Sequence, residues 1–535
     1  MTKTDNTVRR PKRVSLADFC GRMFRLPEEA EAWREEGAGA SVLLLGLGPG
    51  RPWTLPFLAA ARDVYWLEAP ATLAALAKSS EGDALSQRMA DMPAHWQRVT
   101  PEEAVRVSAF CRRLFYVPGL RLAPDFWGHL LGRLDAALCG RGTVSHRRAV
   151  LLPGSENQLL HQELRIALGQ CGFGPVLEQV PSGAFPQQGH AGLQGDSFLQ
   201  GWRRLLGQGR PDFLLSVNLR GMDPEGRVFY LCREQNIPVA LWFVDNPWHV
   251  LSRLRFPWWR DTQIFVTDDA FLSSLRREGA RHVHHLPLAV APHMWQTHEA
   301  FQNFGDRPLF VGRSAFPDRE RFFAAARVPQ SLEDEATGVL RASSGPGEAP
   351  NFFWWHDRLG GALWPGHDVR RVGLGAERCA QANRVRWLLA AGAGRPEGIR
   401  IVGDARWKNL LPDAEVLPQV DYYTTLPQMY AGASAVLNVT SLLMPQSLSQ
   451  RHFDVWASGG LLLSDATQGL DIFPRDLTEP IILRSPEDFM TRWDQLRSHP
   501  EISMDLRRAW QEHLHKYHGY EHRVRRMVEI LVNER

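Results

Sequence analysis

The chain has 535 residues, of which 44% are hydrophobic and 23% are charged, and these values are ordinary for a globular protein with large cores. Its net charge is only +3, from 62 basic and 59 acidic residues. The overall charge therefore gives no reason to expect a nucleic acid or an anionic membrane as partner. Length alone predicts roughly three to four domains.

The six cysteines are scattered, and no two have the Cys-x-x-Cys spacing of a zinc or redox motif. We therefore expect free thiols in a reducing compartment. The basic segment 1–13 is expected to be a disordered tail. No apolar run reaches the length of a membrane span, and the N-terminus lacks a signal-peptide core. We predict a soluble cytoplasmic protein without an integral membrane segment.

The first block, residues 14–142, has the pattern of a Rossmann-like accessory domain. ASVLLLGLGPG predicts a strand that ends in glycines, and DVYWLEAP predicts a second strand that ends at Glu68. In a dinucleotide site such glycines let the backbone approach a phosphate, and the acid binds ribose hydroxyls. Here Pro49 and Pro52 stand where the phosphate helix should begin. The pattern leaves two alternatives, a structural module and a ligand site at Gly46 and Glu68.

The second block, residues 146–260, repeats a strand–helix–strand rhythm. HRRAVLLPGSEN, PDFLLSVN and IPVALWFVDNP each predict an apolar strand that ends in polar residues. Because the carboxyl ends of parallel strands meet at one edge of a sheet, these polar residues should line a ligand crevice. The residues expected there are Gly154, Ser155, Glu156, Asn218, Asp245 and Asn246. Each of them singly also suits a turn or a helix cap.

The third block, residues 262–490, is predicted to hold a second Rossmann-like domain. Its expected strands are TQIFVTDD, HVHHLPLAV, RPLFVGRS, GIRIVGDARW, SAVLNVT and GGLLLSD. Residues 317–396 lack a strong strand signal and predict a mostly helical insertion, and residues 491–535 predict amphipathic helices. The fold class is therefore α/β, with two Rossmann-like domains that face a cleft of the kind that binds nucleotides.

The stretch QRHFDVWASGGLLLSD contains the sharpest candidate site. Arg451 and Asp454 are three residues apart and share one face of a predicted helix, which ends at Gly459 and Gly460. An exposed ion pair is the alternative. The helix follows a polar loop and lies between two apolar strands, which favours an anion site. There Arg451 would bind a diphosphate and Asp454 would accept ribose hydroxyls.

Further candidates for binding a nucleotide follow the neighbouring strands. The residues are Gly312, Arg313, Arg406, Lys408 and Asn438. A guanidinium or ammonium group at a strand end can neutralise a phosphate, although a solvated side chain is the alternative for Arg313 and Lys408.

Residues 210–530 resemble the bacterial CgeB-like (spore-maturation-protein type) glycosyltransferases of the GT-B superfamily, glycosyl transferases group 1. The matching motifs are VDNP, LPLAV, FVGRS, LNVT, RHFDVWASGGLLLSD and HGYEHR. The resemblance implies a nucleoside-diphosphate-sugar donor in the C-terminal half, with contacts from the helix of Arg451 and its Gly459–Gly460 end. It implies an acceptor, a protein or a glycan, on the N-terminal side. It also implies no metal, because arginine, lysine and the helix dipole replace the cation.

Two positions depart from the wider group. Its paired glutamates, eight residues apart, correspond here to Gln446 and Asp454, and its lysine after the VGR motif corresponds to Asp318, which Arg319 follows. These departures leave open whether the transfer retains or inverts the anomeric configuration.

The expected mechanism is sugar transfer with electrostatic stabilisation of the departing diphosphate by Arg313, Lys408 and Arg451. If the reaction inverts, Asp245 is the first candidate for the base that deprotonates the acceptor, with Glu156 and His161 as alternatives. Two other functions stay open. The GLGPG block would suit an S-adenosylmethionine or dinucleotide enzyme, and a decayed cleft would suit a non-catalytic binding protein.

Overall fold

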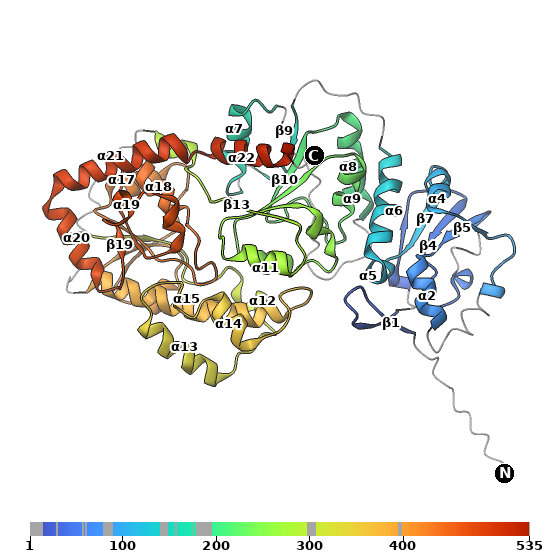
Figure 1. Ribbon diagram of the computed structural model, residues 1–535, viewed down its shortest axis with the longest axis horizontal. Coiled ribbons are helices and arrows are strands. Elements are labelled where there is room, and N and C mark those ends of the chain that lie inside the picture. The colour runs from blue at the N-terminus through green and yellow to red at the C-terminus, as the bar shows by residue number, and fades with distance from the viewer. Residues whose placement is uncertain are drawn as a thin grey trace, which may run out of the picture.

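The computed structural model describes residues 14–27, 30–55, 58, 61–78, 89–139, 148–155, 158–174, 176–177, 195–296, 307–393 and 398–533. These residues form an α/β protein with three sheets of mainly parallel strands, one at each end of the long axis and one in the middle (Figure 1). A small antiparallel hairpin, β1 (Ser15–Ala17) with β2 (Met23–Arg25), accompanies the N-terminal sheet.

The N-terminal sheet has the order β3-β7-β4-β5-β6, with β3 antiparallel to β7 and the other pairs parallel. Its strands are β3 (Trp33–Glu36), β4 (Ser41–Leu45), β5 (Val64–Leu67), β6 (Gln97–Arg98) and β7 (Cys111–Tyr116). Its helices are α2 (Pro70–Lys78), α4 (Pro101–Val107), α5 (Gly119–Leu122) and α6 (Pro124–Ala137). Successive residues of β4 bury into two different clusters, as expected for a strand covered on both faces.

The N-terminal domain packs on the middle domain through α6 and α9 (Arg227–Glu234). Tyr230 on α9 lies directly over two glycines of α6. A Cβ atom at Gly128 would come within 2.1 Å of the Tyr230 ring, and one at Gly132 within 2.8 Å of Tyr230. The glycines are therefore required for the close approach of the two helices.

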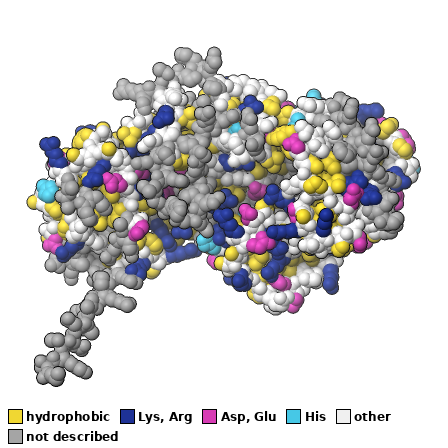
Figure 2. Space-filling view, turned by 180° about the vertical axis from the view of Figure 1, so that it is seen from behind, with side chains coloured by type: hydrophobic (Ala, Val, Ile, Leu, Met, Phe, Trp, Pro, Cys, Tyr) yellow, Lys and Arg dark blue, Asp and Glu magenta, His cyan; other side chains and the backbone are white. Residues whose placement is uncertain are grey.

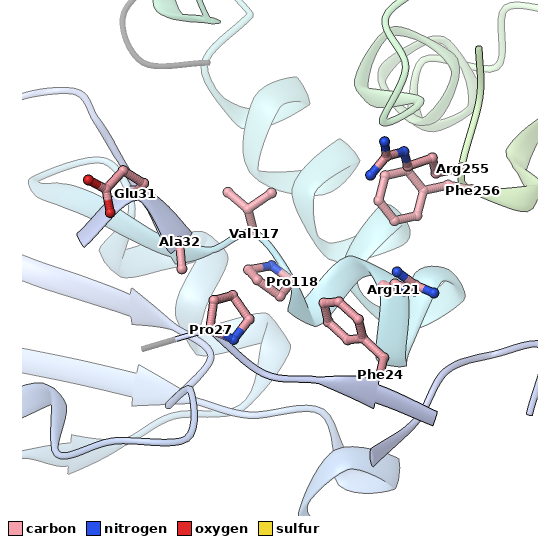
Figure 3. Close-up of a pocket in the computed structure, with 9 residues that line it drawn as sticks. All are labelled: Phe24, Pro27, Glu31, Ala32, Val117, Pro118, Arg121, Arg255 and Phe256. Atoms are coloured by element: carbon pink, nitrogen blue, oxygen red, sulfur yellow. The ribbon is translucent and has the colours of Figure 1, made fainter. Parts of the chain in front are cut away.

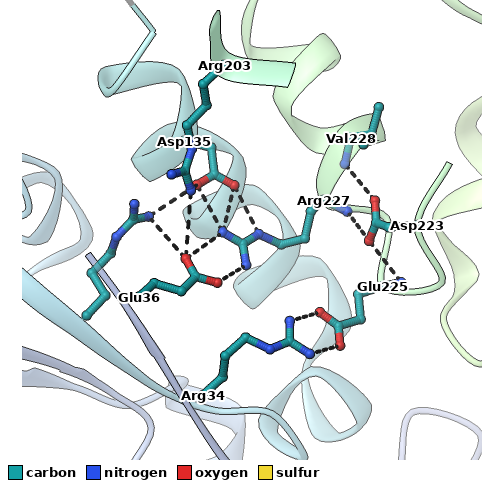
Figure 4. A network of polar contacts seen from close by, with 9 residues as sticks. Arg34, Glu36, Asp135, Arg203, Asp223, Glu225, Arg227 and Val228 are labelled. Atoms are coloured by element: carbon teal, nitrogen blue, oxygen red, sulfur yellow. Dashed lines mark hydrogen bonds and ion pairs between the residues drawn. The ribbon is translucent and has the colours of Figure 1, made fainter. Parts of the chain in front are cut away.

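A buried network of charges joins the same two domains (Figure 4). Arg227 donates to Glu36 at 2.7 Å and to Asp135 at 2.9 Å, and its side chain is almost fully buried. Arg113 and Arg203 also contact Asp135. Burial opposes the charge of Glu36, but the neighbouring guanidinium groups, Arg227 first, outweigh it and lower the pKa of Glu36.

The middle sheet has the order β13-β12-β11-β10-β8-β9, and all of its strands are parallel. The strands are β8 (Val150–Leu151), β9 (Val176–Leu177), β10 (Phe213–Val217), β11 (Val239–Phe243), β12 (Gln263–Val266) and β13 (His282–His285). Its other helices are α7 (His161–Gln170), α8 (Gly195–Gln208), α10 (Pro247–Leu251) and α11 (Phe271–Arg277).

The position of β12 and β13 corrects the predicted domain division. The boundary between 260 and 262 is wrong, because both strands continue the middle sheet in register with β11. Their apolar pattern predicts a strand but does not specify which of two neighbouring sheets it joins.

The C-terminal sheet has the order β16-β15-β14-β17-β18-β19. The strands are β14 (Leu309–Val311), β15 (Arg400–Val402), β16 (Glu415–Leu417), β17 (Val436–Asn438), β18 (Leu462–Asp465) and β19 (Ile482–Leu483). The region of the predicted insertion holds α12 (Arg319–Phe322), α13 (Gln330–Ala342), α14 (Phe352–Leu359) and α15 (Asp368–Gly392). The remaining helices are α16 (Trp407–Leu410), α17 (Thr425–Gly432), α18 (Arg451–Ala457), α19 (Arg475–Thr478), α20 (Asp488–Ser498), α21 (Pro500–Tyr517) and α22 (Tyr520–Asn533).

The middle and C-terminal domains share one hydrophobic core. The last helix, α22, leaves the C-terminal domain and packs on α7 of the middle domain. Arg523 on α22 donates to the carbonyl oxygens of Pro287 and Leu288 in the connecting segment. Leu442 and Leu443, from the loop after β17, are buried in the core of the middle domain. Within the described ranges, no helix has the length and apolarity needed to span a membrane.

We expect the Arg227→Leu variant to lower the free energy of unfolding by about 3–5 kcal/mol, because it removes the guanidinium that compensates two buried carboxylates. The matched control is Arg133→Leu, which removes an exposed ion pair with Glu102 and should cost about 1 kcal/mol or less. Thermal and urea unfolding of both variants measures the difference. Equal losses in the two variants would contradict a structural role for the buried network.

Candidate active site

The carboxyl ends of β10 and β11 bring two predicted residues into contact. The Nδ2 atom of Asn218 donates to Oδ2 of Asp245 at 2.8 Å, and the Asn218 Oδ1 atom accepts from the N–H of Val244 at 3.1 Å. Asn218 and Leu219 both have left-handed backbone conformations, with φ of 51° and 64°. Such residues are uncommon outside turns and functional sites. Here the turn aims the Asn218 amide at the Asp245 carboxylate.

Asp245 lies in a strongly cationic environment. Its side chain is solvent-exposed, yet protein surrounds it on most sides. The resulting loss of hydration raises its pKa, while the hydrogen bond from Asn218 and the charges of Arg220, Arg253 and Arg313 oppose the rise. Arg313 follows a strand of the C-terminal sheet, whereas Asp245 follows a strand of the middle sheet. The two predicted residues therefore face each other across the domains.

Asn246 and Asp268 bind the loop that follows β17. Asn246 donates to the carbonyl oxygen of Leu443 at 2.9 Å and caps α10 through the N–H groups of Trp248 and His249. Asp268, at the end of β12, accepts from the N–H of Gln446 at 3.1 Å. Burial raises the pKa of Asp268 to about 7. Asn246 therefore has the predicted capping role and also joins the two domains.

His161 is buried beneath the loop after β8. A Cβ atom at Gly154 would come within 2.4 Å of His161 Nδ1, so the glycine makes room for the imidazole. Ser155 is exposed, and its N–H donates to Gln158. Glu156, the other predicted alternative base, lies outside the described residues. His161 is only 1% exposed, so the structure does not present its ring to the cleft as the prediction required.

Asp454 is buried and already hydrogen-bonded, which corrects the prediction of an open ribose-binding carboxylate. Its Oδ2 atom accepts from the Tyr422 hydroxyl at 2.7 Å, and its Oδ1 atom accepts from Gln450 Nε2 at 2.8 Å. Burial raises its pKa to about 7. Spacing along the helix predicts which face Asp454 occupies, but not that a tyrosine from the loop after β16 covers that face.

A second buried carboxylate lies in the same interdomain cluster. Glu163 on α7 is 1% exposed, and its Oε2 atom accepts from the Tyr423 hydroxyl at 3.5 Å. Burial raises the pKa of Glu163, and its charge contributes to the raised pKa of Asp454. Two adjacent tyrosines therefore bind one buried acid from each domain. Tyr422 donates to Asp454 of the C-terminal domain, and Tyr423 donates to Glu163 of the middle domain.

Arg451 is half-buried, and it already binds protein groups through Nη1 and Nε. Its Nη1 atom donates to the carbonyl oxygen of Val311, and its Nε atom donates to Asn438 Oδ1 at 3.1 Å. Asn438 in turn donates to Ser464 and Asp465. Arg451 forms no ion pair with Asp454 among the described contacts, so the surface-pair alternative is wrong. Both Arg451 and Asn438 belong to one polar network at the carboxyl end of β17.

The turn after β14 presents Arg313 to solvent. Asp404 accepts from the N–H and the hydroxyl of Ser314, each at 2.7 Å, and Arg384 donates to the Ser314 carbonyl oxygen. The carbonyl oxygen of Gly312 accepts from Trp407 Nε1 at 2.9 Å. These contacts fix the turn on both sides of Arg313, whose side chain stays exposed.

Four other predicted donor residues are exposed beside this turn or have packing roles. Arg406 and Lys408 are exposed, and Arg406 pairs with Glu320 of α12 at 3.2 Å. Gly459 has a φ of 81° and follows the C-terminal end of α18, whereas Arg451 is at the N-terminal end. A Cβ atom at Gly460 would come within 2.6 Å of the Tyr430 carbonyl oxygen. The two glycines therefore end and pack the helix, in place of the predicted donor contact.

The GLGPG block of the N-terminal domain forms a turn that Glu68 binds through its carboxylate. Glu68 is 5% exposed, and its carboxylate accepts from the N–H groups of Leu47 and Ala69, each at 2.8 Å. Gly46 and Gly48 have φ values of 88° and 62°, and a Cβ atom at either would come within 3.0 Å of a neighbouring side chain. The acid therefore ties the glycine turn to the next strand, and its oxygens are not directed to a ribose.

Several site residues carried no clear signal in the sequence. Arg220 and Arg253 stand beside Asp245, but arginine is abundant in this chain and neither belongs to a motif. Asp268 follows a strand that the prediction assigned to the wrong domain. Within the described residues, no group of three or more His, Cys, Asp or Glu side chains is arranged to hold a metal ion.

Comparison with known proteins gives one family match. Residues 381–529 match a family model described as glycosyl transferase-like. The matched stretch begins within α15, ends within α22 and includes the strands β15 to β19. No curated protein matches the chain.

Several solved structures resemble the chain at low identity. A glycosyltransferase from Rickettsia africae ESF-5 has 9% identity and a TM-score of 0.42, and the match covers 72% of this chain and 98% of that one. BGT of T4 phage, solved with UDP and Mn2+, has 10% identity and a TM-score of 0.37, with 72% and 99% covered. The α,α-trehalose 6-phosphate synthase of Burkholderia multivorans has 12% identity and a TM-score of 0.37, with 73% and 97% covered.

The raised pKa of Asp454 predicts a pH-dependent stability. A carboxyl group with a pKa near 7 in the folded state and near 3.8 in the unfolded state binds more protons when folded, so its contribution to stability falls as the pH rises from about 4 to 7. The loss can reach roughly 4 kcal/mol, at 1.36 kcal/mol for each pKa unit. We expect the Asp454→Asn variant to lose less stability than the wild type between pH 5 and pH 8.

Urea unfolding of the wild type and Asp454→Asn at both pH values measures this difference. Comparing the two proteins cancels the contribution of Asp268, because both proteins retain this acid. The same pH dependence in both proteins would show that Asp454 is not protonated in the folded state.

Proposed function

We propose that this protein is a glycosyltransferase that moves a sugar from a nucleoside-diphosphate sugar to an acceptor hydroxyl without a metal ion. The observation that carries the proposal is that Arg313 lies near enough to Asp245 to act on its charge, at the facing strand ends of two parallel sheets. Open parallel sheets bind ligands at this edge. The glycosyl transferase-like match at 381–529 supports the same activity for the C-terminal domain.

In the proposed reaction the acceptor hydroxyl attacks the anomeric carbon of the donor sugar as the bond from that carbon to the diphosphate oxygen breaks. Asp245 takes the proton of the hydroxyl, and its raised pKa makes it a stronger base than an ordinary aspartate. The nucleoside diphosphate leaves with the negative charge. Arg313 stabilises this charge, and the backbone of the Gly312–Ser314 turn is held in place by Asp404. This arrangement corresponds to inversion at the anomeric carbon.

The buried state of Asp454 favours a second candidate, a non-catalytic protein that binds the acceptor or a nucleotide. In this structure the Tyr422 hydroxyl donates to the Asp454 carboxylate, the group that would bind the ribose. A donor would have to displace Tyr422, or bind its ribose elsewhere. The enzyme and the binding protein differ in whether a bound donor is turned over.

Release of nucleoside diphosphate from a panel of UDP-, GDP- and dTDP-sugars, and of CMP from CMP-sugars, tests the proposal. We expect slow release from one donor, unchanged by EDTA. Arg313→Ala should lower the rate at least tenfold, because a charge-assisted contact of about 1.5–3 kcal/mol is lost. Asp245→Asn should lower it by about a hundredfold or more, because the variant cannot take the proton.

The control is Arg277→Ala, which removes an exposed arginine of α11 and should leave the rate unchanged. Calorimetry with the free nucleoside diphosphate separates binding from chemistry. Binding without release would favour the non-catalytic candidate. An active Asp245→Asn variant would exclude Asp245 as the base.

A further inference from the structure

An apolar cavity lies outside the interdomain cleft, at the junction of the N-terminal and middle domains (Figure 3). Its volume is about 440 Å³. Phe24, Val117 and Pro118 line it from the N-terminal domain, and Phe256 lines it from the middle domain. A cavity of this size and lining suits one or two apolar side chains of a partner.

Two arginines at the edge of the cavity differ in how their charge is compensated. Arg121 pairs with Asp18 at 2.9 Å and stacks on the Phe24 ring, 4.2 Å from its centroid. Arg255 is exposed, and no carboxylate among the described residues pairs with it. Glu31 lies on the opposite side of the cavity from Arg255 (Figure 3). The side of the cavity formed by the middle domain is therefore positively charged.

A row of basic side chains connects this side of the cavity with Asp245. Burial and then the charges of Arg370 and Arg255 lower the pKa of His367, and the charge of the neighbouring Asp368 opposes this shift. Burial and the charge of Arg253 lower the pKa of Arg370, and Arg253 also acts on Asp245. The segment that contains His367 and Arg370 lies against the segment that contains Arg253 and Arg255, because Trp364 Nε1 donates to the Leu254 carbonyl oxygen at 3.1 Å. Lys and Arg side chains also gather near the middle of the face in Figure 2, beside a histidine.

We propose that the junction cavity and this row of cations bind an acidic polypeptide segment, which is the acceptor of the proposed transferase. One apolar side chain of the segment enters the cavity, and its carboxylates lie along Arg255, Arg370 and Arg253 toward Asp245. The acceptor role depends on the proposed function, whereas the docking does not.

The apolar cavity favours a polypeptide over an anionic polysaccharide. A polysaccharide would pair with the cations but has no aliphatic or aromatic side chain to bury among Phe24, Val117 and Phe256. A polypeptide supplies both kinds of group, and the spacing of its residues can match a cavity followed by a row of charges. Ionic contacts on an exposed surface weaken with salt, so the binding should be salt-dependent.

Fluorescence anisotropy with defined probes tests the docking without any donor present. The probes are a fluorescein-labelled peptide with one tryptophan followed by glutamates, the same peptide with alanine in place of the tryptophan, and labelled polygalacturonate. We expect the tryptophan peptide to bind at least tenfold more tightly than the alanine peptide. Arg255→Glu should weaken its binding at least tenfold, whereas the control Arg277→Glu should leave it unchanged.

Equal affinity of the wild type and Arg255→Glu for the tryptophan peptide would overturn the proposal. Equal loss in Arg255→Glu and Arg277→Glu would also overturn it, because only net charge would then matter. Preference for polygalacturonate over both peptides would assign the row to a polysaccharide. Arg255-dependent binding of the tryptophan peptide by a protein that releases no nucleotide would support the docking and contradict the proposed activity.

Discussion

The arrangement of the site depends on the insertion of the loop after β17 into the core of the middle domain. Leu442 and Leu443 are buried there, among residues of the middle domain and of the helices α13 to α15. Asn246 and Asp268 bind the backbone of this loop, each from the end of a different strand of the middle sheet. Buried apolar contacts and satisfied buried polar groups together fix one relative orientation of the two sheets. That orientation brings their carboxyl edges face to face.

Charge at these edges is unevenly distributed. Around Asp245 the arginines outnumber the acids, which suits a site for anions. Deeper in the interface, Glu163 and Asp454 are buried with tyrosines and have raised pKa values. The exposed edge is thus suited to binding a diphosphate, whereas the buried acids join the domains. The N-terminal domain is held on the opposite side of the middle domain by the network around Arg227.

Strand patterns in the sequence predicted the α/β class and the polar residues at strand ends, because apolar runs and the residues that follow them are local features. Asn218, Asp245 and Arg313 were predicted in this way, and the structure places all three at strand ends. The sequence did not predict which sheet β12 and β13 join, since that depends on packing between distant segments. It also did not predict that Tyr422 would cover Asp454, because helix spacing specifies a face but not its neighbour. Arginines outside any motif, such as Arg253, carried no signal in an arginine-rich chain.

Amide hydrogen exchange with and without UDP, GDP and dTDP tests the central claim most directly, because it locates a bound nucleotide without requiring an acceptor. Binding at the facing strand ends predicts slower exchange both at 310–316, after β14, and at 243–249, after β11, with one of the three nucleotides. Protection confined to 44–50 and 66–69 of the N-terminal domain would place the ligand at the GLGPG turn and contradict the account. No protection by any of the three would show that the cleft does not hold these nucleoside diphosphates.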